Sequence, residues 1–145
     1  MQEVKKIDKL VNEICHKANV ECYRATIKTI LESIYGHGAV VSCTEHSSAS
    51  SIYKNHIRLS TVEIKVPVNI IWSLLHEFGH YLDGPRQPEH IQLDREINAW
   101  KIAETWVDKY PQLILKKSSF KEFRAWCMNS YYNDYNIPID QREWD

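Results

Sequence analysis

Long apolar runs are absent from this chain of 145 residues. No segment approaches the roughly 18 consecutive apolar residues that a membrane-spanning helix needs. Residues 1–8 place charged side chains between single apolar ones, so they lack the uninterrupted apolar stretch of a secretory signal peptide. We therefore expect a cytoplasmic protein that has no membrane partner.

An excess of charge of one sign is also absent. The 18 lysines and arginines are balanced by 19 aspartates and glutamates, which leaves a formal net charge of −1. Because no global positive field attracts a polyanion, direct binding of nucleic acid is not expected.

The cysteines lack the spacing of a redox or metal motif. Cys15, Cys22, Cys43 and Cys127 form no C-x-x-C pair, and four cysteines in a chain of this size do not make a disulfide scaffold. We expect reduced thiols with a mostly structural role.

The most informative pattern that is present is His76-Glu77-x-x-His80. In a helix of about 3.6 residues per turn, side chains at i and i+4 project from one face, so both histidines can reach one metal ion. Glu77 lies one residue round from them, where it can act as general base toward a water in the open metal position. The pattern predicts a zinc hydrolase site.

A catalytic zinc needs a third protein ligand. The extended pattern H-E-x-x-H-x-x-G-x-x-H does not supply one, because this chain has Asp83 where that pattern has glycine and Arg86 where it has histidine. Asp94 and Glu104, in the next predicted helix, lie on other faces than the residues expected to point inward.

Glu96 is the better candidate for the third ligand. It shares a helical stripe with Trp100, Ala103 and Val107, which should face the core. An ionised carboxylate is rarely buried unless it is paired or bound to metal, so an inward Glu96 fits a metal site. The alternative is that Glu96 faces solvent in the first helical turn, where the helix dipole favours acids.

Helices are predicted in five segments from apolar spacing, an apolar run or a capping pattern. Pro67 fits the first turn of the helix that carries the histidines, because its missing N–H costs nothing there. Ser119 and Glu122 form a capping-box pattern at the start of the last helix. Residues 131–145 show no clear period. The five segments are residues 4–18, 27–34, 67–83, 93–110 and a last helix from residue 119.

Strands are predicted beside the histidine helix. Residues 39–43 and 52–59 are rich in β-branched or alternating side chains, with a polar loop between them, and residues 62–66 alternate again. We expect one domain over residues 1–145 of the α+β class, mainly helical, with a small sheet of two or three strands.

A resemblance extends these inferences. The motif His76-Glu77-x-x-His80, followed by Glu96 leading Glu96-x-x-Ala99-Trp100, resembles the ImmA/IrrE family of small gluzincin metallopeptidases over roughly residues 27–110. Trp100 is a departure from thermolysin-like gluzincins, which place an acid there to orient a histidine. Many members of the ImmA/IrrE family carry a helix-turn-helix unit, and no such unit is recognisable in this sequence.

The resemblance implies a minimal zincin-like domain that holds one zinc ion through His76, His80 and Glu96. It also implies hydrolysis of a peptide bond in a specific intracellular protein, such as a regulator, with Glu77 as general base. One alternative is a zinc amidase of the peptide-deformylase kind with Cys43 as third ligand. Another is a regulatory or interaction module that retains the fold without catalysis.

Other residues of the site remain open from the sequence. Candidates for stabilising the oxyanion are Tyr53, His56 and the tyrosines between residues 131 and 135. Asp83 or a backbone carbonyl could orient the two histidines of the motif. His90 could touch substrate. Residues 52–59, if they form an edge strand over the cleft, could bind an extended polypeptide by strand addition.

Overall fold

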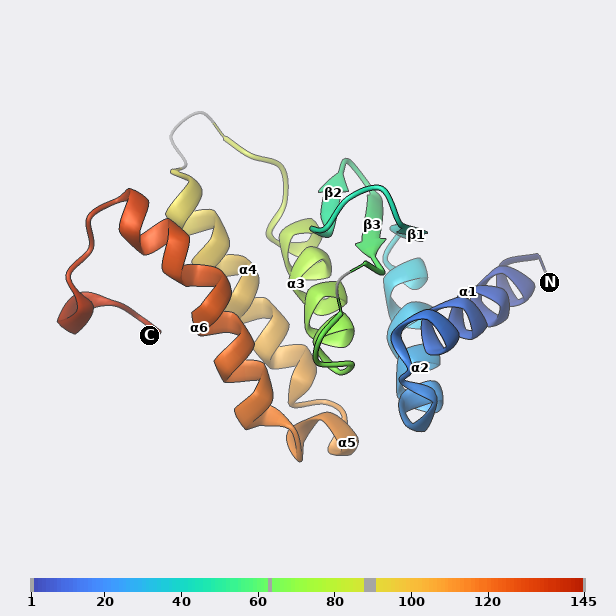
Figure 1. Cartoon of the computed structure of the whole chain (residues 1–145). Helices are drawn as coiled ribbons and strands as arrows, with labels where there is room; N and C mark the ends of the chain where they lie inside the picture. The colour runs from blue at the N-terminus through green and yellow to red at the C-terminus, as the bar shows by residue number, and fades with distance from the viewer. Residues whose placement is uncertain (1, 63, 88–90, 145) are drawn as a thin grey trace.

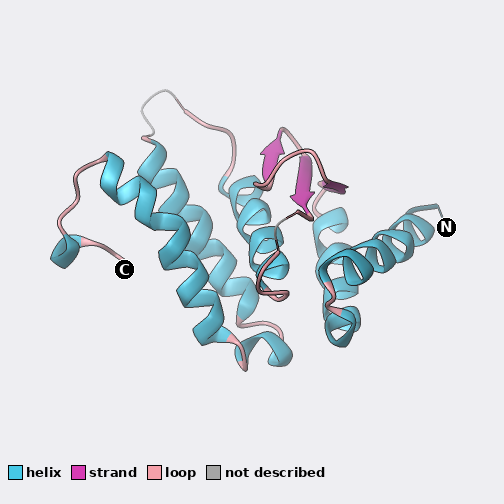
Figure 2. Ribbon diagram, in the orientation of Figure 1, coloured by secondary structure: helices cyan, strands magenta, loops and turns pink. Residues whose placement is uncertain are grey.

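The computed structural model describes residues 2–62, 64–87 and 91–144. It confirms the α+β class: the protein is 64% helical and has a small three-stranded mixed sheet. Figure 2 shows one pair of helices at the N-terminal end of the molecule, the sheet above its middle, and the remaining helices toward the C-terminal end. Within the described residues, every helix is too short or too polar to cross a bilayer.

The N-terminal pair consists of α1 (Gln2–Ala18) and α2 (Arg24–Gly36), joined by a short 3-10 helix. The predicted amphipathic stripes are buried; Ile14 and Ile30, for example, are at most 1% exposed. Gly38 follows α2 with φ 92°, a left-handed conformation that glycine adopts without a steric penalty. This turn directs the chain into the sheet.

The sheet has the strand order β1-β3-β2, with β1 (Val40–Thr44), β2 (Ser51–Tyr53) and β3 (His56–Ser60). β1 pairs parallel with β3, and β2 pairs antiparallel with β3. The prediction of one strand over residues 52–59 is therefore wrong. A turn at Lys54, whose φ is 56°, divides this segment into a hairpin, so β2 is a short edge strand and β3 is central.

The alternating segment after β3 was predicted to be a short strand or an extended segment, and none of its described residues lies in a strand. Val62, Ile64 and Val66 lie in an irregular connection to the next helix, and residue 63 is outside the described residues. The segment cannot pair with the strand that precedes it, because β3 is already paired with β1 on one side and with β2 on the other. Instead, these three side chains line a cleft.

Two helices form the centre of the molecule, α3 (Asn69–Asp83) and α4 (Gln92–Val107). α3 begins two residues after Pro67, which lies in the preceding turn and not in the first helical turn as predicted. The two helices touch at Gly79, where an added Cβ would lie 2.3 Å from the carbonyl oxygen of Ala99. Glycine at this position therefore permits the two backbones to approach closely.

The C-terminal layer contains α5 (Pro111–Ile114) and α6 (Lys117–Asp134). α4 ends three residues before the predicted end, and Pro111 begins α5 as its first residue. The predicted capping box is wrong, because α6 begins at Lys117 without a side-chain cap. The Ser119 hydroxyl instead accepts a hydrogen bond from Trp72 Nε1 at 3.4 Å. Part of the tail without a clear period, residues 131–134, belongs to α6.

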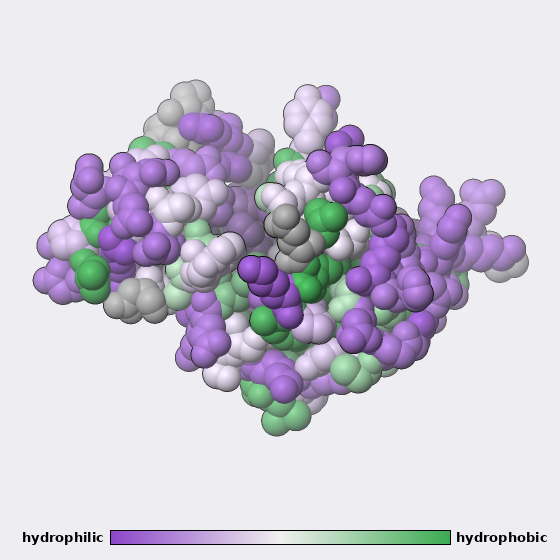
Figure 3. Space-filling model, in the orientation of Figure 1, coloured by the Kyte–Doolittle hydropathy of each residue, from purple (hydrophilic) through white to green (hydrophobic). Residues whose placement is uncertain are grey.

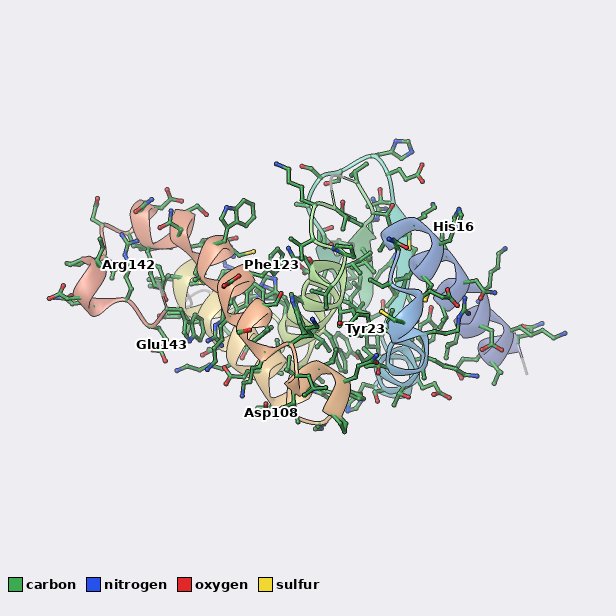
Figure 4. The ribbon with its side chains drawn as sticks, turned by 60° about the horizontal axis from the view of Figure 1, so that its bottom comes forward. His16, Tyr23, Asp108, Phe123, Arg142 and Glu143 are labelled. Carbon is green, nitrogen blue, oxygen red and sulfur yellow. The ribbon has the colours of Figure 1, made fainter. Side chains whose placement is uncertain are left out.

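The last residues fold back onto α6. Arg142 donates hydrogen bonds to Asn129, Asn133 and the backbone oxygen of Ile137, and Figure 4 shows it at the end of the molecule. Hydrophilic residues cover most of the face seen in Figure 3, while apolar residues are exposed chiefly along its middle and lower part.

Candidate metal centre

The two histidines of the motif lie on the inner face of α3. His80 is 9% exposed and His76 is half-buried, and their ring centroids are 4.7 Å apart. This is the arrangement that i, i+4 spacing predicts on one face of a helix. Their Nε2 atoms both point at the carboxylate of Glu96, which lies 3.0 Å from His76 and 2.8 Å from His80.

Glu96 reaches these histidines from the second turn of α4. It is 4% exposed, so the alternative in which it faces solvent is wrong. Gln92, one turn earlier, donates a hydrogen bond to its Oε2 atom at 3.0 Å. Ligand atoms of His76, His80 and Glu96 all lie within 4.8 Å of one another. Two imidazoles and one carboxylate are a donor set suited to zinc, and the close helix contact at Gly79 brings them together.

The charges in this cluster are strongly coupled. Burial alone would raise the pKa of Glu96, but the hydrogen bonds with His76 and His80 outweigh burial and lower that pKa to about 2. Burial alone would lower the pKa of His80, but the hydrogen bond and charge of Glu96 raise it. The Glu96 carboxylate thus stabilises positive charge beside it. That charge is carried either by protons on the imidazoles or by a metal ion that replaces those protons.

Trp100 packs directly on the first histidine of the motif. Its indole lies parallel to the His76 ring, with centroids 4.1 Å apart and an interplanar angle of 6°. Trp100 is fully buried, and Phe120 and Phe123 contact it edge-on. Among the described residues, Asp83 makes no hydrogen bond to a motif histidine. The His76 ring is therefore held by its hydrogen bond with Glu96 and by stacking on Trp100, which occupies the position where thermolysin-like enzymes have an acid.

Glu77 is also buried, with 7% of its surface exposed. Its Oε1 atom lies 3.6 Å from Nδ1 of His76. Burial is the largest influence on Glu77 and raises its pKa; the charge of Glu96 adds to this, while His76 and His80 oppose it. A carboxylate with a raised pKa holds a proton more readily than an exposed one, which suits a general base that later donates that proton.

The cluster opens into a cleft. One wall carries residues 48–52, which include part of the edge strand β2, and the irregular residues 62 and 64–66. The other wall carries the first turns of α4 and the side of α6 that includes Phe123, Trp126 and Tyr131. A substrate chain in this cleft would therefore lie between an edge strand and two helices.

Tyr131 is the candidate for oxyanion stabilisation that lies in the cleft. Burial is the largest influence on the pKa of Tyr131 and raises it, and the charges of Glu96 and Glu77 raise it further. The other candidates are less suitable. Tyr53 is 75% exposed, and His56 contacts the Ser42 hydroxyl at 2.7 Å outside the residues that line the cleft.

The two remaining tyrosine candidates, Tyr132 and Tyr135, are also less suitable than Tyr131. Tyr132 is 2% exposed and accepts a hydrogen bond from the Trp144 backbone, so its hydroxyl is already engaged. Tyr135 follows α6 and does not line the cleft. His90, which was considered for contact with substrate, lies outside the described residues.

Cys43 does not join the cluster. It lies in β1, at the opposite edge of the sheet from β2, and is absent from the residues that line the cleft. Burial raises the pKa of its thiol to about 12, which keeps it neutral. The amidase alternative, which needs Cys43 as a metal ligand, therefore has no support from the described residues.

The chain was compared with known proteins. No family model matches it, and no curated protein or solved structure is significantly similar to it.

Proposed function

We propose that this protein is a zinc-dependent metallopeptidase with a minimal zincin-like domain of the ImmA/IrrE kind. The observation that carries the proposal is that His76, His80 and Glu96 converge within 4.8 Å while the buried Glu77 lies beside them in one cleft. The histidine motif supplies three of these four residues. The glutamate from a separate helix completes a donor set that leaves a position for water.

A zinc ion held by His76, His80 and Glu96 would lower the pKa of water and polarise a peptide carbonyl. Glu77 accepts the proton of the attacking water and passes it to the leaving amine. Tyr131 has a raised pKa and so stays protonated, which lets its hydroxyl donate a hydrogen bond to the developing oxyanion.

The cleft supports a polypeptide as substrate. Ser51 and Ile52 of the edge strand β2 line it, and β2 pairs with a strand on one side only, β3, among the described residues. An extended peptide can add to such an edge through backbone hydrogen bonds. We infer a protein substrate inside the cell, with a regulator as the kind of target the family resemblance implies.

The test is cleavage by matched variants. Wild type and Glu77→Gln are incubated with proteins from the source cells, and new N-termini are identified by mass spectrometry. Glu77→Gln keeps both imidazoles and the carboxylate of Glu96, so we expect normal zinc content and loss of all zinc-dependent cleavage. Cleavage by Glu77→Gln at the wild-type rate would contradict the proposal. Cellular function retained without cleavage would favour the regulatory module.

A further inference from the structure

Arg95 is a cation beside the candidate metal ligands, and the described residues provide it with no anionic partner. It precedes Glu96 on α4, is half-buried and lines the cleft. Its Nη1 atom is buried and donates no hydrogen bond to any described residue. The ion pairs among the described residues engage Arg24 and Arg124 but not Arg95.

Such an arrangement is costly unless a ligand completes it. A buried N–H without an acceptor loses its hydrogen bonds to water and gains none in return. Arg124 also has a buried nitrogen, Nε, without a hydrogen-bond partner among the described residues, but its charge is paired with Glu104 and lies over the rings of Phe120 and Trp144. Arg95 has no comparable partner in the part of the chain that the structure describes. Its charge is close enough to His80 to lower the pKa of that histidine, against the larger effect of Glu96.

Two further cations lie at the rim of the cleft that contains Arg95. Arg86 and Lys65 also line the cleft and are exposed, so they add positive charge at its rim. The acids that line the cleft are Glu77 and Glu96, which we assign to catalysis and metal binding, and Glu122. Glu122 is exposed on the α6 wall. A guanidinium presents its N–H groups in a planar fork that matches the two oxygens of a carboxylate.

We propose that Arg95 binds a carboxylate of the peptide substrate, so that the enzyme prefers peptides with a free carboxylate near the scissile bond. This proposal rests on the proposed function and names the chemistry of its substrate. The carboxylate belongs either to an acidic side chain or to the C-terminus of a short peptide. Both sources present the same group to Arg95, and the experiment distinguishes them.

The experiment uses four peptide hydroxamates on one isobutylsuccinyl scaffold, measured by calorimetry on the zinc-loaded full chain. One pair ends in glycine with a free carboxylate or a carboxamide, and the other pair ends in amidated glutamate or amidated glutamine. We expect one carboxylate to bind wild type about 10- to 100-fold more tightly than its amide twin, as for a charge-assisted bidentate pair. The pair that shows the difference identifies the source of the carboxylate.

The variants assign this preference to Arg95. In Arg95→Gln we expect the difference between the twins to disappear while the amide twin binds as it does to wild type. Lys101→Gln is the matched control, because Lys101 lies on the same helix, is exposed and pairs with Glu143 outside the cleft. It should keep the full preference. Arg95→Lys, which keeps the charge but loses the fork, should keep part of it.

Two results would overturn the proposal. Equal binding of both twins in both pairs to wild type would do so without any variant, and hence independently of whether Arg95→Gln folds. An equal loss of affinity for acid and amide in Arg95→Gln would assign Arg95 a structural role. If no probe binds wild type in a zinc-dependent manner, the proposed function itself fails, which is a different outcome.

Discussion

The indole of Trp100 covers one face of the His76 ring, so we expect it to help orient that imidazole. The two rings are stacked, and the indole Nε1 is buried without a hydrogen-bond partner, so Trp100 acts through its face and not through a hydrogen bond. In many metal sites a carboxylate or carbonyl performs this orienting role. Here a flat apolar surface limits the rotation of the imidazole.

Substitutions of Trp100 test this role. We expect Trp100→Leu to weaken zinc binding by about 10-fold or more, in the range found for groups that orient metal ligands, while Trp100→Phe keeps most of the affinity by preserving a ring. Zinc affinity is measured by competition with a chromophoric chelator, and thermal unfolding shows whether each variant is folded. Wild-type affinity in a folded Trp100→Leu would contradict the assignment.

Tyr131 should affect the chemical step more than binding. We expect Tyr131→Phe to lower kcat by about 100-fold with little change in KM, because the hydroxyl interacts with charge that develops in the transition state. Steady-state kinetics on a cleaved peptide measure both constants. An unchanged kcat would exclude Tyr131 as the oxyanion donor.

The stability of the zinc-free protein should depend on pH at two limits. The pKa of Glu96 is lowered to about 2 from 4.5. Its contribution to the free energy of unfolding is therefore complete above pH 4.5 and is lost as the pH falls toward 2. The pKa of His80 is raised above 6.5, so its contribution is complete below pH 6.5 and is lost as the pH rises through the higher folded value. Maximum stability is predicted between about pH 5 and 6.5.

The size of this effect is on the order of 1 to 3 kcal/mol in the free energy of unfolding. Urea unfolding of chelator-treated protein across pH 3 to 9 measures it. Glu96→Gln, which cannot ionise, should flatten both limits. A wild-type profile with the same shape as that of Glu96→Gln would show that the hydrogen bonds to the histidines do not form.

At the scale of elements, the close contact between α3 and α4 creates the site. The ligands come from both helices, and their separation depends on the absence of a side chain at Gly79. The motif pattern leaves this position free, so the glycine carries no signal by itself. Only the crossing of two helices shows why the residue before His80 is glycine.

Gly79→Ala should therefore move the helices apart. The added methyl group would lie 2.3 Å from the Ala99 carbonyl oxygen, which is backbone and cannot move independently of α4. We expect a loss of about 1 to 3 kcal/mol in the free energy of unfolding, and weaker zinc binding. Gly36→Ala is the control, since nothing lies within 4 Å of an added Cβ there, and it should be neutral or slightly stabilising. Equal effects of both changes on unfolding would contradict this account.

Local sequence patterns predicted which helices form better than they predicted where each helix begins and ends. The apolar stripes of α1, α2 and α4 were enough to predict the helices, because burial of one face follows directly from their spacing. The hairpin turn at Lys54 could not be predicted, since a non-glycine residue adopts a left-handed conformation there. The capping pattern at Ser119 and Glu122 misplaced the start of α6 by two residues, and the Ser119 hydroxyl takes part in a tertiary hydrogen bond with Trp72 that a local pattern cannot reveal.

At the scale of the whole molecule, zinc would join parts that are distant in the chain. The two histidines and Glu77 could be predicted from the spacing of one motif, and Glu96 from its place on an inward stripe. The stacking of Trp100 on His76 and the place of Arg95 in the cleft could not, because they depend on which side chains meet in the folded chain. A metal bound only by the folded arrangement also stabilises that arrangement.

The most direct test of the central claim is the zinc affinity of wild type beside Glu96→Ala and Asp94→Ala, measured by competition with a chelator and by zinc content after dialysis. We predict one tightly bound zinc ion in wild type and in Asp94→Ala, whose substituted residue is exposed on the same helix. Glu96→Ala should lose most of the affinity. Equal zinc binding by Glu96→Ala and wild type would contradict the three-ligand site.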